Sequence, residues 1–492
     1  MNEARGPGGV CETAMLRSPI SMSRGSRSKV LGKMIALRVA VILTAMQLVA
    51  MLIPQRARAG ATGLTSLASK RFPHQSEAER KLLHFVDSDN QQRGQWVYAG
   101  RSANPSDPDN FPENAATWSH DRNIRAEMIR WLASDPDASR RVDPIGIKVF
   151  GARIVGGLDL SHIHVPFPVS LVQCFIPERM NLESTNISFF DLAGSRTGEI
   201  FGQNMVVEGD LDIGYDNNPF RDTWVQGEVF LVGAKVAGAA CLGGGHYFHS
   251  KVEPMGWGVD LKKAIDLTGA DVKGELNLGY GFEAHGAVIL FNAFMGQLDL
   301  IGGHFINPDN IALDASTAMI AHDVDALPLP GLASPFNGLK GGGGVGTGPA
   351  FEADGMVKFV TAHVGGSVVF QNARFEGKPG EKHGLDAGGI LVQNALVWQN
   401  VTLENGAILI LSGAAIGGLL DDEKSWPAPG KLIIDDFRYV TFGPNSPWSA
   451  TTRLRWLGLQ PTFRSQPYVH LAQVLRDHGD EARCAFRPRP TK

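Results

Sequence analysis

The chain has 492 residues, of which 43% are hydrophobic and 20% are charged, so a wholly disordered protein is excluded. Glycine is unusually frequent, because 58 glycines amount to about 12% of the chain against a usual ~7%. The glycines follow no strict three-residue period, which excludes a collagen triple helix. So many glycines in an otherwise apolar chain predict short strands joined by tight corners.

The first 59 residues carry a net charge opposite to that of the rest. They contain nine Lys and Arg against two Asp and Glu, whereas residues 60–492 contain 37 against 48. Five basic residues at 24–38 precede an apolar run at 39–53 and an Ala-Arg-Ala sequence at 57–59. This order is typical of a secretory signal peptide, and the apolar run is shorter than the ~20 residues of a spanning helix. Residues 1–59 are therefore predicted to be a signal peptide or an N-terminal anchor. Either predicts an exported protein of the periplasm or cell envelope, and the anchor would hold it in the inner membrane.

The acidic part after residue 59 argues against nucleic acid as a partner, because phosphate binding needs a basic face. It contains three cysteines, Cys174, Cys241 and Cys484. An odd number at wide spacing does not form a disulfide framework.

Two segments that follow have helical spacing of their apolar residues, at 75–88 and 113–134. The intervening residues 100–112 are rich in Pro, Asp and Asn and predict a loop. We expect residues 60–140 to form a helical N-terminal cap.

Residues 265–278 (IDLTGADVKGELNL) define a repeated pattern in which apolar residues alternate with polar ones and glycines mark the corners. Close copies begin at residues 145, 229, 357 and 409, and partial copies begin at 207 and 288. Strict alternation over four to six residues predicts strands with one buried face. Because one short strand cannot bury that face alone, the copies are expected to stack on one another. Independent sandwich hairpins are the rival architecture, but they need Asn-Gly or Asp-Gly turns, and few are found.

We therefore predict a mainly β protein: a parallel β-helix (β-solenoid) over residues 141–445, with α-helical caps at both ends. At roughly 20–25 residues per coil, the array would hold about a dozen coils. The Pro- and Gly-rich residues 326–350 are expected to form a loop that projects from one corner. Residues 446–492 are expected to form a helical C-terminal cap and tail, since end helices cover unpaired strand edges.

Three stretches carry a family resemblance: residues 125–132 (RAEMIRWL), 151–160 (GARIVGGLDL) and 466–476 (QPYVHLAQVLR). As a set they resemble a group of bacterial pentapeptide-like β-solenoid proteins of unknown function, over about residues 113–482. The resemblance implies a solenoid fold and a link to the cell envelope. Some members are labelled membrane-associated oxidoreductases by automatic transfer, and the resemblance supplies no catalytic residues. The chain departs from the pattern after residue 483, where relatives are expected to continue with further helices.

Asp159, Asp212, Asn277 and Asp299 share one position of the repeat, between its last two inward residues. Alternation points them outward, and stacking would place some of them in a row about 5 Å apart. Because carboxylates in such a row repel one another, a cation could bridge them, and we consider these residues a candidate calcium site. The alternative is a solvated polar face whose charges are separated by intervening coils.

Other motifs carry weaker signals. The pairs His162 and His164, and His246 and His249, have spacings that a metal could use, but no Cys or carboxylate partner accompanies them. The glycine run at 341–348 lacks the Lys-Ser/Thr ending of a phosphate loop and indicates a linker. Five aromatic residues near the C-terminus could stack on sugars or pack the last coil against its cap: Trp426, Trp448, Trp456, Phe463 and Tyr468.

These observations favour an exported, non-catalytic binding or scaffold protein of the bacterial cell envelope, with an envelope protein or a glycan as its partner. No cofactor is expected beyond calcium. One alternative is a carbohydrate-active enzyme, a polysaccharide lyase or hydrolase, which would need two carboxylates about 5–10 Å apart beside aromatic walls. The other is a membrane-associated oxidoreductase, which would need a bound flavin, nicotinamide, haem or metal.

Overall fold

The structure is a computed structural model that describes most of the chain after residue 62 as one compact unit. The predicted signal peptide, the glycine run at 341–348 and Cys484 lie outside the described residues. The described ranges are 63–214, 222–250, 262–329, 350–378 and 383–478, with the backbone of a short hairpin, β15 (Asp216–Asn217) and β16 (Phe220–Arg221).

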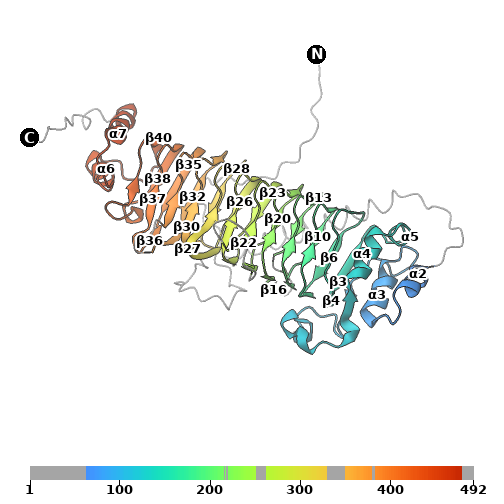
Figure 1. Ribbon diagram of the computed structural model, residues 1–492. Helices are drawn as coiled ribbons and strands as arrows, with labels where there is room; N and C mark the ends of the chain where they lie inside the picture. The colour runs from blue at the N-terminus through green and yellow to red at the C-terminus, as the bar shows by residue number, and fades with distance from the viewer. Residues whose placement is uncertain are drawn as a thin grey trace, which may run out of the picture. The chain divides into compact units, whose positions relative to one another are not determined.

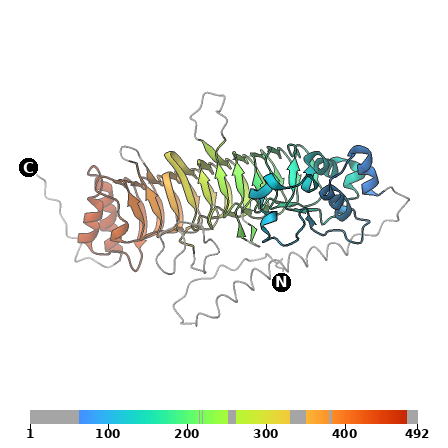
Figure 2. The ribbon, with the colours of Figure 1, turned by 90° about the horizontal axis from the view of Figure 1, so that it is seen from below.

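The described chain forms a parallel β-solenoid of about ten coils, which confirms the predicted fold class. Figures 1 and 2 show the coils stacked between helices at either end. Among the described strands every pairing is parallel except the β15–β16 hairpin, and one isolated bridge, Asp87 to Val142, is also antiparallel. Stacked parallel coils exclude the sandwich of independent hairpins.

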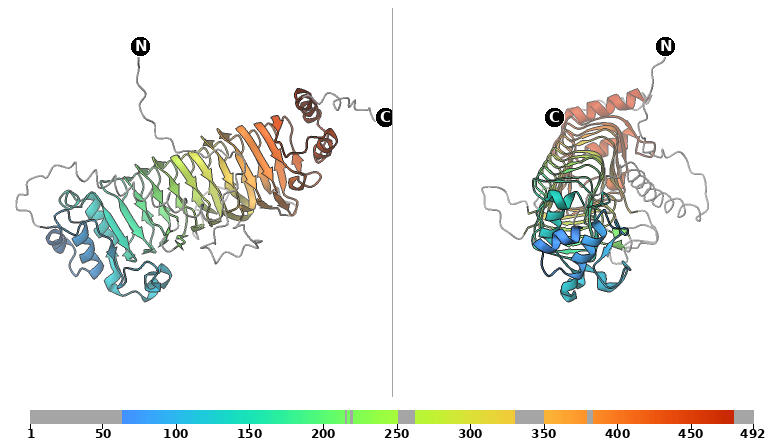
Figure 3. Two further views of the ribbon diagram at one scale, coloured as in Figure 1. Left: turned by 180° about the vertical axis from the view of Figure 1, so that it is seen from behind. Right: turned by 90° about the vertical axis from the view of Figure 1, so that its right-hand side faces the viewer.

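Backbone pairing sorts the strands into four columns, one for each face of a coil (Figure 3). We number the columns in the order in which the chain visits them. On the first column Val169 pairs with Phe190, and Phe190 pairs with Leu211, so one coil takes 21 residues here.

The first and second columns contain strands of two to four residues. The first holds β1 (Val97–Tyr98), β3 (Ile147–Phe150), β6 (Val169–Val172), β10 (Phe190–Asp191), β14 (Leu211–Asp212), β20 (Ala240–Cys241), β29 (Val324–Ala326) and β32 (Val368–Gln371). The second holds β2 (Asn123–Arg125), β4 (Arg153–Val155), β7 (Phe175–Ile176), β11 (Arg196–Thr197), β17 (Trp224–Gln226), β21 (His246–Phe248), β24 (Glu283–His285), β33 (Arg374–Glu376) and β36 (Thr402–Glu404).

The third and fourth columns are built in the same way. The third holds β8 (Met180–Asn181), β12 (Ile200–Phe201), β18 (Val229–Phe230), β22 (Lys263–Asp266), β25 (Ala287–Ile289), β34 (Gly384–Asp386), β37 (Ile408–Ile410) and β39 (Leu432–Ile433). The fourth holds β5 (His164–Val165), β9 (Asn186–Ile187), β13 (Val206–Val207), β19 (Lys235–Val236), β28 (Met319–Ile320) and β31 (His363–Val364).

Longer strands turn a corner and belong to two columns. Five run from the fourth column into the first: β23 (Asp271–Asn277), β26 (Phe294–Asp299), β35 (Leu391–Gln399), β38 (Ala415–Asp421) and β40 (Arg438–Phe442). Two run from the second column into the third: β27 (His304–Asp314) and β30 (Glu352–Lys358).

A five-residue period underlies the coil. Leu182, Ile187, Leu192, Thr197 and Val207 are all at most 3% exposed and follow one another in multiples of five residues. Five residues for each of four faces account for a coil of about 20 residues. The longer pattern at 265–278 is thus three faces of one coil, which is consistent with a pentapeptide-repeat-like fold.

The corners explain part of the glycine surplus. Gly194, Gly233 and Gly269 turn corners with φ between 63° and 68°, and Asn204 and Asn292 do so with φ near 55°. This left-handed region is open to glycine, tolerable for Asn and costly for other residues. Frequent glycine therefore follows from the number of corners.

Helices and turns flank the coils. At the N-terminal end these are α2 (Leu64–Arg71), α3 (Glu77–Val86), η1 (Pro108–Asn110), η2 (Pro112–Thr117), η3 (His120–Arg122), α4 (Ala126–Ser134) and α5 (Pro136–Ser139). At the C-terminal end they are η4 (Glu423–Ser425), α6 (Ala450–Leu457) and α7 (Ser465–Asp477). Within the described ranges no helix has both the length and the apolar character needed to cross a bilayer.

The expected helix at 113–134 is wrong in its first half. Only α4 is α-helical, and the chain before it forms η2, η3 and strand β2. Strand β2 pairs with β4, so Ile124 lies beside Ile154 in the first coil. The backbone of β2 finds its hydrogen-bond partners in the solenoid, and that pairing overrides the local helical spacing.

A buried ion pair joins the last coils to the C-terminal cap. Arg453 of α6 is fully buried and donates two hydrogen bonds of 2.7 Å to Asp421 of β38. Trp426 Nε1 also donates to Asp421, and the Arg453 guanidinium carbon lies 3.7 Å from the centre of the Phe442 ring. Because both charges are buried, removing either residue would leave the other as an unpaired charge inside the protein, which is strongly destabilising.

We expect Arg453→Met to destabilise the protein by about 3–5 kcal/mol, because Asp421 would remain buried without its partner. The double variant Arg453→Met, Asp421→Leu should recover much of that loss. Urea unfolding followed by circular dichroism measures both. Arg455→Met breaks the exposed Arg455–Glu423 pair on the same helix and is the control, with an expected loss below about 1 kcal/mol. Equal losses in the two single variants would contradict this account of the cap.

Candidate functional site

Three of the four predicted calcium ligands lie on the first column. Asn277 and Asp299 are direct neighbours on adjacent coils. Cys241 occupies the coil between Asp212 and Asn277, so Asp212 is separated from the other two. Asp159 lies on the third column and pairs with Asn181. Stacking thus brings together two of the four residues, and whether they bind calcium stays a prediction.

Each of the four side chains has a structural role. In each, Oδ1 accepts a hydrogen bond from the backbone N–H two residues ahead, at 2.9–3.1 Å. This Asx turn closes the corner after the strand. The same bond recurs at Asp191, Asp266, Asp314 and Asp386. The Asx turn at each corner therefore explains why Asp or Asn recurs at this position of the repeat. Within the described ranges, no three His, Cys, Asp or Glu side chains are grouped so as to hold a metal ion.

Asp299 is the most perturbed member of this set. The residue is only 4% exposed, and burial raises the pKa of its carboxyl to about 7 against the lowering effect of the Ile301 amide. Nearby Glu275 and Asp325 raise the pKa of Asp299 further. Asp325 is its neighbour on the next coil, and burial and Asp323 raise the pKa of Asp325 as well. Ionising Asp299 in the folded protein is therefore unfavourable.

We expect Asp299→Asn to stabilise the protein above pH 7 by about 1–3 kcal/mol, because the amide keeps the Asx turn without the charge. The wild-type carboxyl has a raised folded pKa. Its stabilising contribution is therefore fully present below the unfolded value of 3.8 and is lost as pH rises through about 7. Urea midpoints across this pH range measure the difference.

Asp386→Asn is the matched control, since Asp386 makes the same turn between Lys358 and Ile410. It should give no gain at high pH. A pH-independent effect of Asp299→Asn would contradict the expectation.

A row of stacked rings lies on the outward side of the second column. Trp224 stacks on His246 with ring centres 4.2 Å apart and on Phe248 at 5.6 Å. Phe248 in turn stacks on His285 at 4.6 Å, with the planes within 5°. The Arg196 guanidinium lies 5.0 Å from the Trp224 ring. We call Trp224, His246, Phe248 and His285 the ring ladder.

Carboxylates hold the ring ladder in place. His246 Nε2 lies 3.4 Å from Asp222, and its Nδ1 lies 3.8 Å from Glu283, which also contacts His285. Burial alone would lower the pKa of His246, but the two carboxylates raise it to about 9. The histidines hold the pKa of Glu283 far below its usual range. His246 is therefore an imidazolium between two carboxylates at neutral pH.

A second cluster continues along the same column. Arg374 lies within 3.3–3.7 Å of Glu352, Asp354 and Glu404 and 2.8 Å from Glu376. His304 Nε2 lies 3.4 Å from Asp354. We call these six residues the arginine cluster.

The hydrogen bond with His304 lowers the pKa of Asp354, while burial and the charge of Asp354 raise the pKa of Glu376. With four carboxylates around one guanidinium and one imidazole, the cluster has an excess of negative charge.

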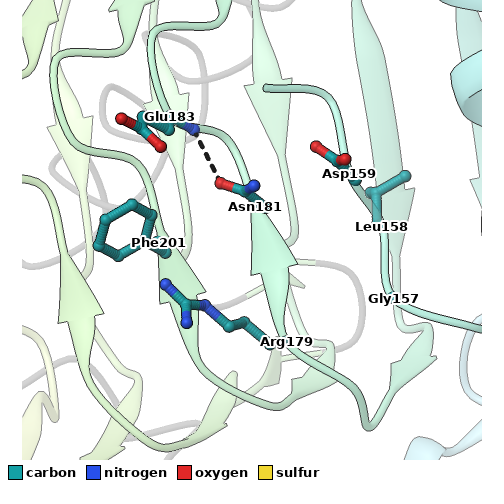
Figure 4. Close-up of a pocket in the computed structure, with 7 residues that line it drawn as sticks. All are labelled: Gly157, Leu158, Asp159, Arg179, Asn181, Glu183 and Phe201. Atoms are coloured by element: carbon teal, nitrogen blue, oxygen red, sulfur yellow. Dashed lines mark hydrogen bonds between the residues drawn. The ribbon is translucent and has the colours of Figure 1, made fainter. Parts of the chain in front are cut away.

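A hollow of about 450 Å³ lies on the third column, over the first coils (Figure 4). Its lining residues are Gly157, Leu158, Asp159, Arg179, Asn181, Glu183 and Phe201. The Arg179 guanidinium lies 4.4 Å from the centre of the Phe201 ring, which stacks on Phe230 at 5.1 Å.

Further along the third column, two glutamates occupy the same position of adjacent coils. Glu199 precedes β12 and is 3.2 Å from Arg179 Nε, and Glu228 precedes β18. The Glu228 carbonyl accepts the Ile200 amide N–H, which fixes the two glutamates as neighbours. Among the described residues no hydrogen-bond donor reaches the buried Glu228 Oε1, and burial raises the pKa of Glu228 to about 7.

The remaining predicted candidates do not converge on a site. His162 lies 3.8 Å from Glu183, His164 contacts Asn186, and His249 contacts a backbone carbonyl. Burial raises the pKa of Cys174 to about 12 and that of Cys241 higher still, so neither thiol is a ready nucleophile.

The C-terminal aromatic residues divide between two roles. Trp426 and Trp456 lie against Arg453, and Trp448 packs on Phe442, so these three belong to the packing of the cap. Phe463 is 73% exposed and pairs with Tyr468.

The ring ladder and the arginine cluster could not be predicted from the repeat at 265–278, because that repeat ends one face before the second column. That pattern covers the third, fourth and first columns, and the second-column strand β24 follows it. Trp224, His246 and Glu283 occupy equivalent positions of successive second-column strands. An alignment of whole coils would have shown this row. No family model, no curated protein and no solved structure matches the chain.

We expect His246→Phe to lower stability by about 1–3 kcal/mol at pH 6, because the stacked ring is kept while Asp222 and Glu283 lose their cation. A histidine with a raised folded pKa contributes stability below its unfolded value of 6.5, and the contribution is lost as pH rises through about 9. The deficit should therefore shrink above pH 9, as urea midpoints would show. His363→Phe, on the exposed fourth column, is the control. A deficit that is constant with pH would show that packing alone is affected.

Proposed function

We propose that the chain is an exported, non-catalytic β-solenoid scaffold of the bacterial cell envelope that binds a glycan on the outward side of its second column. The observation that carries the proposal is the preorganised surface there. The ring ladder and the arginine cluster hold their side chains in place by stacking and ion pairs. A surface that is already ordered loses little conformational entropy on binding.

The positions of the inserted segments in the sequence also favour the second column as the binding face. The chain departs from its coil period at residues 215–221 and 330–349, between first-column and second-column strands. It does so again at 251–261 and 379–382, between second-column and third-column strands. In the sequence, all four segments thus lie between strands that border the second column. Residues inserted between the strands of a rigid framework are where binding functions concentrate.

The chemistry of this face favours a neutral or amino-bearing glycan over an anionic one. The arginine cluster has more carboxylates than cations, so it would repel uronate or phosphate groups. A parallel solenoid repeats its side chains at about 4.8 Å, which suits a polymer with a repeating unit. The basic, apolar and Ala-Arg-Ala order within residues 24–59 supports export to the envelope, as does the family resemblance.

A carbohydrate-active enzyme is the second candidate, and one observation favours it. Glu199 and Glu228 are neighbours on adjacent coils beside the Phe201–Phe230 stack. Glu199 is ion-paired, whereas Glu228 has a pKa of about 7 and is suited to donate a proton. A pair of neighbouring carboxylates with separated pKa values is typical of glycoside hydrolases. Release of reducing ends by the wild type, abolished in Glu228→Gln, would establish this activity in place of the scaffold role.

A glycan-array screen of the full chain, with and without calcium, tests the main proposal. We expect binding to neutral or amino-bearing glycans, weakened roughly tenfold by His285→Ala and by Glu376→Ala, because each removes a fixed group from the second column. Isothermal titration with the best glycan measures the affinities.

His363→Ala and Leu391→Ala, both exposed on the fourth column, are the matched controls and should leave binding unchanged. Equal effects of second-column and fourth-column variants would refute the assignment to this face. Binding that requires calcium and is lost in Asp212→Ala or Asp299→Ala would support the calcium hypothesis. Capture of an envelope protein by the second column, with no glycan bound, would replace the glycan by a protein partner.

A further inference from the structure

The hollow on the third column exists because one coil lacks a side chain. Gly157, Arg179 and Glu199 occupy the same position of three successive coils, immediately before the inward Leu158, Met180 and Ile200. Gly157 leaves its coil without a side chain at this position. A Cβ atom there would make a tight contact of 3.3 Å with the Arg179 carbonyl oxygen and lie 3.8 Å from Glu178 Oε2, so a longer side chain at this position would crowd the hollow.

One wall of the hollow is a fixed guanidinium. Arg179 turns away from Gly157, as Figure 4 shows, and lies over the Phe201 ring with its Nε 3.2 Å from Glu199. Phe201 is itself supported by Phe230. The apolar stack and the ion pair restrain a side chain that is still half exposed, so its terminal N–H groups are available to a ligand.

The opposite side of the hollow carries two carboxylates, which accept hydrogen bonds, and one side-chain amide. Asp159 is ion-paired with Arg130 of α4 at 3.1 Å and accepts hydrogen bonds from Ser161. Asn181 Oδ1 accepts the Glu183 amide N–H, so its Nδ2 points the other way, toward Asp159 (Figure 4). The Glu183 carboxylate is 38% exposed and lies 3.8 Å from His162.

These groups suit hydroxyls better than ions. Asp159 is paired with Arg130 and Glu199 with Arg179, which leaves the Glu183 carboxylate as the surplus charge of the lining. One surplus carboxylate would repel a strong anion, and among the described residues it belongs to no group of three metal ligands. Carboxylates accept hydrogen bonds, and the amide and guanidinium donate them, so together they match neighbouring sugar hydroxyls, which both donate and accept. A volume of about 450 Å³ is within the range of small-molecule sites.

We propose that this hollow is a subsite for one neutral sugar residue, in which Asp159, Asn181 and Glu183 bind hydroxyls and Arg179 closes one side. The subsite borders the corner between the second and third columns, next to the surface described above. It rests on the proposed function insofar as the sugar is part of the glycan that the protein binds.

Isothermal titration of the full chain with glucose, galactose, N-acetylglucosamine and their disaccharides tests the subsite, with glucuronate and glucosamine as charged comparisons. We expect one or more neutral sugars to bind. Gly157→Gln should weaken that binding roughly tenfold or more by filling the hollow, and Glu183→Ala by removing an acceptor. Asn181→Asp keeps the Asx turn but loses the Nδ2 donor, and it should also weaken binding. Glu208→Ala, exposed on the fourth column, should have no effect.

The outcomes separate this proposal from the broader one. If no neutral sugar binds, or if Gly157→Gln and Glu183→Ala bind as the wild type does, the subsite is wrong. If glycan binding then still falls in His285→Ala and Glu376→Ala, the second-column proposal stands without it. If no glycan binds to the wild type at all, the proposed function fails together with the subsite. Circular dichroism of each variant confirms that a loss of binding is not a loss of fold.

Discussion

The hydrogen bonds between successive coils determine where every other group in this protein lies. Each coil donates to and accepts from its neighbours in parallel register, as in the run from Val169 through Phe190 to Leu211. A side chain is thereby placed about 4.8 Å from the equivalent side chain of the next coil, on all four faces. Inward rows satisfy this constraint with apolar residues, and Phe282, Phe305 and Phe351 contact one another from coil to coil although they occupy different positions of their coils. Outward rows have no such uniform solution, since equal charges at this spacing repel.

The outward rows show three ways of relieving that repulsion. On the first column, neutral Cys241 and Asn277 separate Asp212 from Asp299, and the Asx turn uses one oxygen of each Asp. Carboxylates still meet at Asp191 and Asp212 and at Asp299 and Asp325, and in the second pair the pKa of each carboxyl is raised. On the second column, rings stack and cations alternate with carboxylates. The arrangement on the second column leaves its side chains rigid and still accessible. This combination distinguishes the second column from the other faces.

The features that recur from coil to coil could be predicted from the sequence. The alternation at 265–278, the glycine corners and the Asp position all recur, so the fold class followed from them. The register could not be predicted where the repeat slips. The alternation of the copy that begins at residue 409 predicts that Leu420 faces inward. Instead Leu419 pairs with Leu396 and is the buried residue, because the register shifts after Val392. The site was missed for a related reason. Trp224, His246 and Glu283 differ in type, so no pattern of identical residues joins them, and only the stacking of whole coils places them in one row.

The insertions distinguish one face from the other three. A solenoid of equal faces would tolerate extra residues at any corner, since each corner is exposed and lengthening a loop costs little free energy. Here the segments at 215–221, 251–261, 330–349 and 379–382 all leave from the two corners beside the second column. The fourth-to-first corner instead carries strands such as β23, β26 and β38, which run through it without interruption. The extra residues are therefore inserted in the sequence only beside the strands whose outward side chains are fixed by stacked rings and ion pairs. The stacking of coils alone gives no reason for that choice of corner, because it tolerates an insertion equally well at each of them.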